Sequence, residues 1–307
     1  MKVIVSGSLA YDRIMNFPEY FSDHILPDKI HVLNVCFQVE GVKENLGGTA
    51  GNIAYALRLM GGTPFVSATI GSDNHRYFEW FAENGISIDG IKVVYTELTA
   101  GAYITTDKGD NQITGFNPGA MKYSSELDFT SLDPEDTLVL VSPGNLDDMV
   151  AYPRQCREAG IPYIFDPGQS LPVLQADALL SAITGAKILI VNDYEFDLIL
   201  DKTGLNKDQL LDLAESTIIT LGEAGSVILN HGRTIKIPVF PARQVVDPTG
   251  AGDAYRGGLI SGLTRGMSLE ESARLGSACA SFAVEHYGTQ VYRFTAEEFA
   301  ARLDSSR

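Results

Sequence analysis

Residues 247–258, DPTGAGDAYRGG, combine a glycine-rich turn with an acidic residue where a helix is expected to begin. Backbone N–H groups in such a turn bind anions, so Gly250, Ala251 and Gly252 are candidate donors to a phosphoryl group. A carboxylate in the first helical turn is favoured by the helix dipole and can accept a proton from a hydroxyl. We therefore interpret Asp253 as a general base beside an anion hole. The alternative is an ordinary glycine turn before an N-terminal helix acid.

The segment ENLGGTAGN, residues 44–52, is a second glycine cluster before an expected helix. Gly47 and Gly48 permit close approach of the backbone to a ligand, and the Asn52 amide can both donate and accept hydrogen bonds. The alternative is a loop-to-helix turn without a ligand. The sequence has no Walker A pattern and no HRD-type loop, so phosphoryl transfer would require a different family of kinases.

The composition excludes several classes of protein. The chain has 307 residues, a net charge of −16 and 45% hydrophobic residues, which is typical of a globular enzyme and unfavourable for binding nucleic acid. Its three cysteines and five histidines show no spacing suited to a disulfide framework or a zinc site. No apolar run is long enough for a membrane helix or a signal peptide. We therefore expect a cytoplasmic protein that binds neither nucleic acid nor membranes.

Strand-like and helix-like patterns alternate along most of the chain. Runs such as KVIVSG, TLVLVSPG and AKILIVND are continuous apolar strands, typical of a parallel sheet buried on both faces. With helical patterns between them, they predict a doubly wound α/β fold whose ligand crevice lies at the carboxyl ends of the strands.

Two segments, at about residues 13–43 and 92–117, do not follow this alternation. The first carries KIHVLNVCFQVEG and the second KVVYTELTAGAYITTDKGDNQITGF, and both show strand-like alternation without a helix, which favours antiparallel strands. We expect them to pair into one small antiparallel β lid over the crevice. The lid would be an insertion in a single domain, residues 1–307. An exposed lid sheet often serves as a dimer surface, so a homodimer is left open.

Two segments, GGTAGNIAYALRLMGG and DPTGAGDAYRGGL, resemble the two signature regions of the PfkB (ribokinase-like) carbohydrate and nucleoside kinases. SGSLAYD, NDYE and TLGEAG occur in the order of that family, and the resemblance covers essentially the whole chain. Within the family, FNPGAM and NDYEFDLIL look most like the bacterial ribokinase-type adenosine kinases. The resemblance implies a ribokinase-like fold and ATP-dependent phosphorylation of the 5′-hydroxyl of adenosine. The alternatives are a ribokinase or another PfkB sugar or nucleoside kinase, and a catalytically silent nucleoside-binding regulator.

The resemblance also implies roles for individual residues. Asp253 resembles the catalytic base of the family, and Asp12 its acceptor-binding carboxylate, which holds two sugar hydroxyls. Together with the glycine cluster and the strand ends, this gives a set of expected acceptor-binding residues: Ser8, Asp12, Gly47, Gly48, Asn52, Phe116 and Gln169. Standing alone, Asp12 would be a turn or capping residue.

On the nucleotide side, the resemblance implies ATP and Mg²⁺ as cofactors and leaves a monovalent cation such as K⁺ open. The residues that match the family's nucleotide-binding positions are Asn192, Thr220, Gly222 and Gly225. Glu195 matches a position associated with Mg²⁺ through ordered water. Standing alone, the Asn192 and Glu195 pair would be a helix cap.

The segments expected to line the acceptor pocket are SGSLAYD, CFQ, GGTAGN, GFNPGA and DPGQS, and they contain no Lys or Arg. A phosphorylated acceptor would need cationic donors, so the pattern predicts a neutral nucleoside. Arg13 adjoins the first segment, but neighbours on a strand point to opposite faces. Phe37 and Phe116 are expected to stack on a purine base. The alternative is that both aromatic side chains only hold the lid sheet together.

Overall fold

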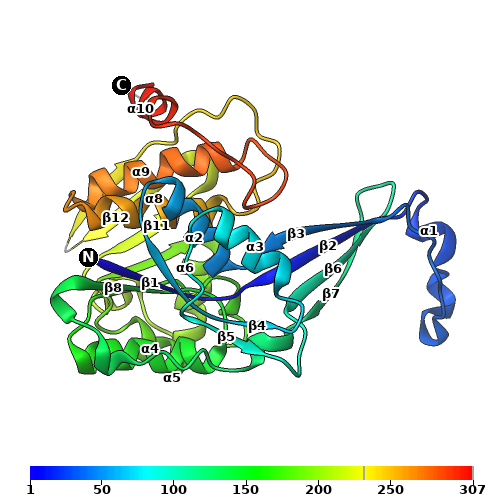
Figure 1. Cartoon of the computed structure of the whole chain (residues 1–307), viewed down its shortest axis with the longest axis horizontal. Helices are drawn as coiled ribbons and strands as arrows, with labels where there is room; N and C mark the ends of the chain where they lie inside the picture. Colours follow the sequence, from blue (N-terminus) through cyan, green and yellow to red (C-terminus); the bar gives the residue numbers. More distant parts are fainter. Residues whose placement is uncertain (231, 306–307) are drawn as a thin grey trace.

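The structure, a computed structural model that describes residues 1–230 and 232–305, contains a large and a small β-sheet (Figure 1). Seven neighbouring strands of the large sheet are parallel, and two antiparallel strands complete one edge. In spatial order the large sheet consists of β13 (Arg233–Ile237), β12 (Ser226–Asn230), β11 (Thr217–Thr220), β10 (Ile188–Asn192), β9 (Tyr163–Phe165), β8 (Thr137–Val141), β1 (Lys2–Ser6), β4 (Pro64–Gly71) and β5 (Ile91–Val94).

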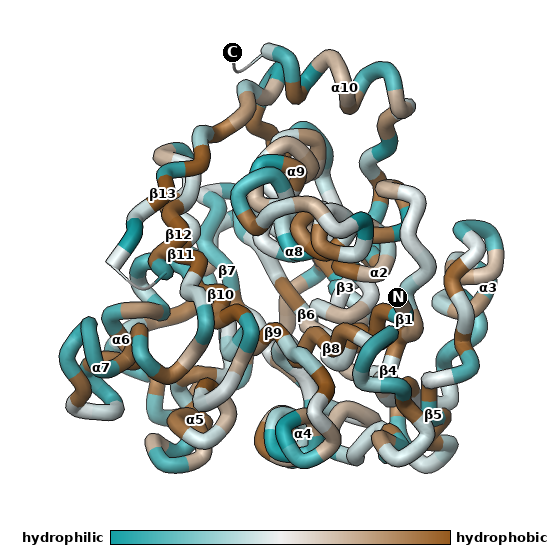
Figure 2. The backbone as a smooth tube through the Cα atoms, turned by 90° about the vertical axis from the view of Figure 1, so that its left-hand side faces the viewer, coloured by the Kyte–Doolittle hydropathy of each residue, from teal (hydrophilic) through white to brown (hydrophobic). Residues whose placement is uncertain are grey.

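Helices cover both faces of the large sheet (Figure 2). One face packs against α2 (Thr49–Leu59), α3 (His75–Glu83), α8 (Ala251–Thr264) and α9 (Leu269–Ala283). The other packs against α4 (Leu146–Ala159), α5 (Ala176–Ile183), α6 (Asp193–Thr203) and α7 (Lys207–Leu211). The last helix, α10 (Ala296–Asp304), joins a third cluster beside α9.

The strands of the large sheet are apolar throughout because consecutive residues enter different cores. In β1, Val3 and Val5 pack in the core under α2 and α8, whereas Ile4 packs in the core under α4 and α5. Such burial on both faces is what a continuous apolar run predicts. Among the helices that the structure describes, none combines the length and the apolar character needed to cross a membrane.

The small sheet extends away from the body of the molecule (Figure 1). Its strands, in order, are β3 (Val42–Gly47), β2 (Ala10–Asn16), β6 (Ala100–Thr106) and β7 (Gln112–Asn117). The pairs β2–β3 and β6–β7 are antiparallel, as expected within each segment, while the central pair β2–β6 that joins the two segments is parallel. The two excursions therefore form one sheet.

Two parts of these segments differ from the sequence-based expectation. Residues 91–94 form β5 of the large sheet. The expected strand in KIHVLNVCFQVEG is wrong: this region follows α1 (Phe21–His24), begins within the 3₁₀ helix η1 (Pro27–Val32), and has no strand before Val42. Ile30 and Val32 are exposed, and the apolar side chains at positions 35, 37 and 39 are only half-buried, so the alternation exists here without a partner strand.

Candidate active site

The turn before α8 separates two cavities at the carboxyl ends of the parallel strands. The first, which we call the lid cavity, has a volume of about 600 Å³ and is bordered by Thr249, Gly250 and Asp253. The second, which we call the outer cavity, has a volume of about 460 Å³ and is bordered by Ala251 and Gly252. One helix N-terminus therefore lies between both spaces, where its dipole favours an anion.

Gly250 makes this turn possible because it adopts the left-handed conformation, with φ of 79°. A Cβ atom at this position would lie 2.8 Å from the Thr289 side chain. Among the three predicted anion-hole residues, the N–H of Ala251 donates to the Pro248 carbonyl oxygen at 3.2 Å. The N–H groups of Gly252 and Asp253 lie in the first helical turn, where no acceptor within the helix is available. These two groups are therefore the ones most directly available to a phosphoryl oxygen.

Asp253 lies at the lid cavity with a half-buried side chain. Burial raises the pKa of its carboxyl group from 3.8 to about 7, against the opposing effects of a hydrogen bond from Asn52 and the positive charge of Arg256. The Asn52 Nδ2 atom donates to Asp253 Oδ2 at 2.8 Å. A carboxylate with a pKa near neutrality is suited to accept a proton from a hydroxyl.

Arg256 supports the same turn from within α8, a role that the sequence did not reveal. Its Nε and Nη2 atoms lie 2.5 and 2.8 Å from the Asp166 carboxylate, and both side chains are almost fully buried. Its Nη1 atom donates to the Gly252 carbonyl oxygen at 2.9 Å. The ion pair thus fixes the backbone of the predicted anion hole. The only sequence signal was an arginine within an otherwise apolar helical stretch, which requires a buried acidic partner.

Asp12, on β2, faces the lid cavity from the small sheet. Burial raises the pKa of its carboxyl group, and within the described part of the chain no group donates a hydrogen bond to it. Gly47 permits this position, since a Cβ atom there would lie 2.6 Å from Asp12 Oδ2. Gly48, with φ of 89°, brings the N-terminus of α2 against the Ser8 carbonyl oxygen, where a Cβ atom would lie at 2.5 Å.

The lid cavity gathers most of the predicted acceptor-binding residues. Besides Asp12 and Asp253, its lining includes Ser8, Gly48, Asn52, Phe116 and Gln169. Gly47 is not in the lining, but its missing Cβ leaves room for Asp12. The described residues that line the cavity include no Lys or Arg. The cavity is therefore suited to a ligand without its own negative charge.

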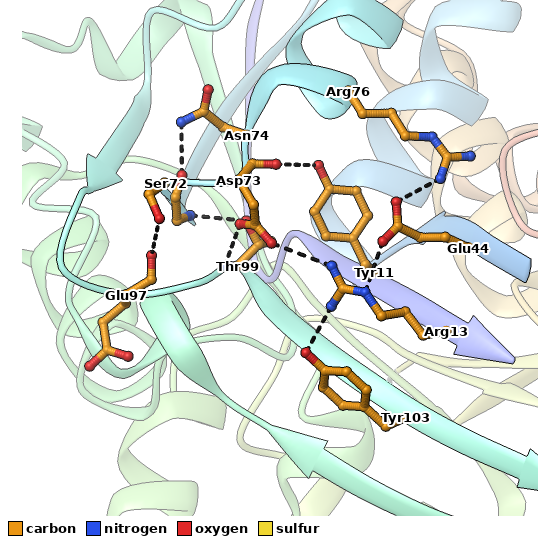
Figure 3. Close-up of polar contacts among 11 residues, drawn as sticks. Tyr11, Arg13, Glu44, Ser72, Asp73, Asn74, Arg76, Glu97, Thr99 and Tyr103 are labelled. Carbon is orange, nitrogen blue, oxygen red and sulfur yellow. Dashed lines mark hydrogen bonds and ion pairs between the residues drawn. The ribbon is translucent and has the colours of Figure 1, made fainter. Parts of the chain in front are cut away.

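Arg13 points away from the lid cavity, as strand alternation predicted. Its guanidinium group contacts Glu44 at 2.8 Å, the Tyr103 hydroxyl at 3.0 Å and Asp73 at 3.4 Å (Figure 3). Asp73 lies in the loop between β4 and α3, so these contacts connect the small sheet to the body of the molecule.

Phe37 does not line the lid cavity, so its predicted place beside a purine is wrong in this structure. It belongs to an aromatic cluster with Phe17, Phe21 and His24, with ring centroids 4.6–6.0 Å apart. Mutual packing of these rings removes apolar surface from water at a place where the chain has no larger core. Phe116 alone remains as an aromatic wall of the cavity, and its side chain is 55% exposed.

The outer cavity contains three of the residues expected to bind nucleotide, namely Thr220, Gly222 and Gly225. Asn192 lies in neither cavity lining and forms a capping box at the start of α6 with Glu195. The Glu195 N–H donates to Asn192 Oδ1 at 2.7 Å, and Glu195 Oε2 accepts from the Asn192 N–H at 2.8 Å. Burial raises the pKa of Glu195.

Among the described residues, no group of three or more His, Cys, Asp or Glu side chains could hold a metal ion. The second carboxylate oxygen of Glu195, Oε1, is not used by the capping box.

Comparison with known proteins agrees with this architecture. Residues 9–294 match the family model for pfkB family carbohydrate kinases, and the chain belongs to that family. It is 31% identical to a nucleoside kinase of Methanocaldococcus jannaschii, over 100% of this chain and 98% of the relative.

Two solved structures of a Burkholderia thailandensis nucleoside kinase are similar over nearly the whole chain. The complex with inosine gives a TM-score of 0.87 and 37% identity, over 99% of this chain and 96% of that chain. The complex with ADP-inosine gives a TM-score of 0.83 and 40% identity, over 98% and 95% of the two chains. The predicted ribokinase-like α/β fold, with a mostly parallel sheet and a small lid sheet, is therefore confirmed.

Proposed function

We propose that this protein is an ATP- and Mg²⁺-dependent nucleoside kinase that phosphorylates the 5′-hydroxyl of adenosine. The observation that carries the proposal is the placement of two carboxylates, Asp12 and Asp253, at one cavity beside an anion-binding helix N-terminus. The outer cavity, on the other side of that N-terminus, offers a place for the phosphate donor. The similar proteins named as nucleoside kinases, one of them solved with inosine, support a purine nucleoside as acceptor.

The lid cavity has features suited to a nucleoside. The Asp12 carboxylate has lone pairs available for two ribose hydroxyls, because no described group donates to it. Phe116 offers an aromatic face to the base, an interaction worth about 1–3 kcal/mol. The cavity volume of about 600 Å³ lies within the range of small-molecule sites. A ribose alone would leave the apolar part of this space unfilled.

In the proposed reaction, the ionised Asp253 accepts the proton of the 5′-hydroxyl as that oxygen attacks the γ-phosphorus of ATP. A bond forms between the acceptor oxygen and phosphorus, the bond from phosphorus to the β–γ bridging oxygen breaks, and ADP leaves. The N–H groups of Gly252 and Asp253 donate to the oxygens of the transferred group, where negative charge must be stabilised. Arg256 holds this turn through the Gly252 carbonyl oxygen.

The remaining predicted residues have supporting roles in this proposal. Thr220, Gly222 and Gly225 border the space for the nucleotide, and Glu195 would hold Mg²⁺ through water. The metal ion, when bound, neutralises charge on the phosphates. The small sheet, which contributes Asp12 and Phe116, would close over the acceptor and exclude water as a competing nucleophile.

A substrate panel tests the proposal directly. ADP formation should be measured with adenosine, inosine, other nucleosides, ribose, fructose and fructose 6-phosphate, and the site of phosphorylation should be identified by ³¹P NMR. Adenosine should give a kcat/KM at least about 10-fold above that of ribose, which corresponds to about 1.4 kcal/mol of stacking energy. Preference for inosine would still indicate a nucleoside kinase but would reject adenosine as the preferred acceptor. Preference for ribose would indicate a ribokinase. Nucleoside binding without ADP release from any acceptor would indicate a silent regulator.

A further inference from the structure

A chain of buried amides continues behind Asn52, away from the lid cavity. Asn52 donates through Nδ2 to Asp253, and its Oδ1 atom accepts from Gln290 Nε2 at 3.0 Å. Gln290 Oε1 in turn accepts from the indole Nε1 of Trp80 at 3.1 Å. Gln290 is only 2% exposed. This chain of hydrogen bonds connects four parts of the protein that are distant in sequence: α3, the segment after α9, α2 and α8.

The donors and acceptors in this series of hydrogen bonds can be arranged in only one way. An indole N–H can only donate, so the oxygen of the Gln290 amide must face Trp80. The nitrogen of the same amide then faces Asn52 and must meet its oxygen. Asn52 is thereby left with its N–H₂ group toward the Asp253 carboxylate. Each orientation follows from the preceding one, beginning at Trp80.

Gln290 is better suited than its neighbour Thr289 to fix Asn52. The Thr289 hydroxyl carries one hydrogen but lies within hydrogen-bonding distance of two acceptors, Asn52 Oδ1 at 2.7 Å and the Leu46 carbonyl oxygen at 3.0 Å. Gln290 Nε2 carries two hydrogens and has two acceptors, Asn52 Oδ1 and the Tyr77 hydroxyl oxygen at 2.9 Å. Both of its hydrogens are therefore used.

The contact with Tyr77 also connects Gln290 to the other carboxylate of the cavity. The Tyr77 hydroxyl donates to the Gly47 carbonyl oxygen at 2.6 Å, and Gly47 is the residue whose missing Cβ leaves room for Asp12. Gly51 in the same glycine cluster makes this approach possible, because a Cβ atom there would collide with the Tyr77 hydroxyl. Gln290 thus lies behind both Asp12 and Asp253.

We propose that Gln290 is a positioning residue for phosphoryl transfer, which holds the Asn52 amide with its N–H₂ group toward Asp253, and that Trp80 sets the orientation of Gln290. The proposal rests on the proposed function, in which Asp253 is the base. If the Asn52 amide were reversed, its oxygen would face the carboxylate. That contact favours the protonated form of Asp253, which cannot accept a proton from the acceptor.

Other ionisable groups surround Asp253, and the variants keep all of their side chains. Arg256 on α8, Asp166 after β9, Tyr77 on α3 and Tyr292 after α9 act on its charge, and Asp12 on β2 lines the same cavity. Gln290→Met also removes the hydrogen bond to Tyr77, whereas Trp80→Phe leaves that bond in place. A shift common to both variants would therefore report the change in the amide chain.

The test is the pH profile of kcat/KM in Gln290→Met and Trp80→Phe, measured with an acceptor that the wild type phosphorylates. Gln290→Met keeps the side-chain length but removes the donor, so we expect the acid limb to move up by about one pH unit. The variant should lose about 10-fold in kcat/KM on the acid limb and recover most of it above about pH 9. Trp80→Phe removes the directing N–H together with one ring of the indole but keeps the Gln290 amide, and it should shift the limb in the same direction by less. Trp80 is the only tryptophan, so its emission also reports loss of the contact in Gln290→Met.

Tyr55→Phe provides the matched control. The buried Tyr55 hydroxyl donates to the Tyr292 carbonyl oxygen at 2.6 Å, from the same helix as Asn52 to the same segment as Gln290, without joining the amide chain. It should lower the melting temperature but leave the acid limb in place. An unshifted acid limb in both folded variants, or an equal shift in Tyr55→Phe, would overturn the proposal.

A second measurement separates this proposal from the proposed function. The pH-dependent difference in stability between the wild type and Asp253→Asn reports the pKa of Asp253 without any catalytic assay. In the Gln290→Met background, the pH at which this difference stops changing, which marks the folded-state pKa, should move up by the same amount, about one pH unit. If the protein phosphorylates none of the tested acceptors but this upper limit moves, the proposed function fails and the positioning of Asp253 stands. An unchanged upper limit would reject the positioning role.

Discussion

Replacing the proposed base, Asp253→Asn, should reduce activity and increase stability, with a pH dependence that can be calculated in advance. Asparagine preserves the shape of the side chain, and its carbonyl oxygen can still accept the hydrogen bond from Asn52 that lies at 2.8 Å in the wild type. It cannot accept a proton, so kcat should fall by about 10²–10⁴-fold while the KM of the acceptor changes little.

The stability effect follows from the pKa of Asp253, which burial raises from 3.8 to about 7. The folded state binds this proton more tightly than the unfolded state. The contribution of Asp253 to the free energy of unfolding is therefore highest below the unfolded-state pKa and decreases as the pH rises to the folded-state pKa. Across the whole range between the two pKa values, this loss of unfolding free energy is about 4 kcal/mol, and about 2 kcal/mol of it occurs between about pH 5.5 and 8.5. Because the side chain is half-buried and borders a cavity, solvent screening reduces the effect to about 1–2 kcal/mol.

Thermal unfolding across this pH range measures the effect. The side chain in Asp253→Asn is uncharged throughout. The melting temperature of the variant minus that of the wild type should therefore be about 2–4 °C larger at about pH 8.5 than at about pH 5.5. Asp197→Asn, an exposed carboxylate on α6, is the control and should show a constant difference. If the difference between Asp253→Asn and the wild type did not change with pH, the argument from burial would be wrong. Near-normal turnover in the variant would reject the base.

Further substitutions test the other parts of the site. Gly252→Val places a Cβ atom 2.9 Å from Arg256 Nη1 and crowds the anion hole, so kcat should fall about 100-fold, or ~3 kcal/mol, with an unchanged circular dichroism spectrum; normal turnover would make the glycine purely structural. Asp12→Asn should raise the acceptor KM by about 10–100-fold with a smaller effect on kcat, and the reverse pattern would refute its binding role. Phe116→Ala should lower kcat/KM for adenosine at least about 10-fold and leave ribose nearly unaffected, as steady-state kinetics would show. Arg13→Met removes the ion pairs drawn in Figure 3 and should speed hydrogen exchange in β2, β3 and β6 before acceptor is added; unchanged exchange would show that other contacts hold the small sheet.

The large sheet could be predicted from the sequence because burial on both faces leaves a local signature. In β8 every residue from Thr137 to Val141 is buried, and no exposed position interrupts the apolar run. The segment before β3 gave a misleading signal. Residues such as Ile30 and Val32 alternate with polar residues but are exposed, and alternation alone does not show whether a partner strand exists.

Asp253 could be placed at the crevice from its glycine-rich turn, whereas the role of Asp12 came only from the resemblance to the PfkB family. The roles of Asn192 and Phe37 were harder to predict. Asn192 and Glu195 form the capping box that their spacing also allowed. Phe37 packs against its own aromatic neighbours, because an aromatic residue in an exposed segment is stabilised by whichever apolar surface is nearest.

The residues that orient the proposed base could not be identified from a sequence pattern. Gln290 and Asn52 are 238 positions apart in the chain, and neither belongs to a local pattern that requires the other. A glutamine in a loop is ordinarily exposed to solvent, and only the fold shows that this one is buried against an amide with a fixed direction. The proposed base could be found from local sequence because a glycine-rich turn and an acidic first helical turn lie within a few residues of each other. The groups that set its protonation are found only from contacts between distant segments, since a pKa depends on every charge and hydrogen bond around the site.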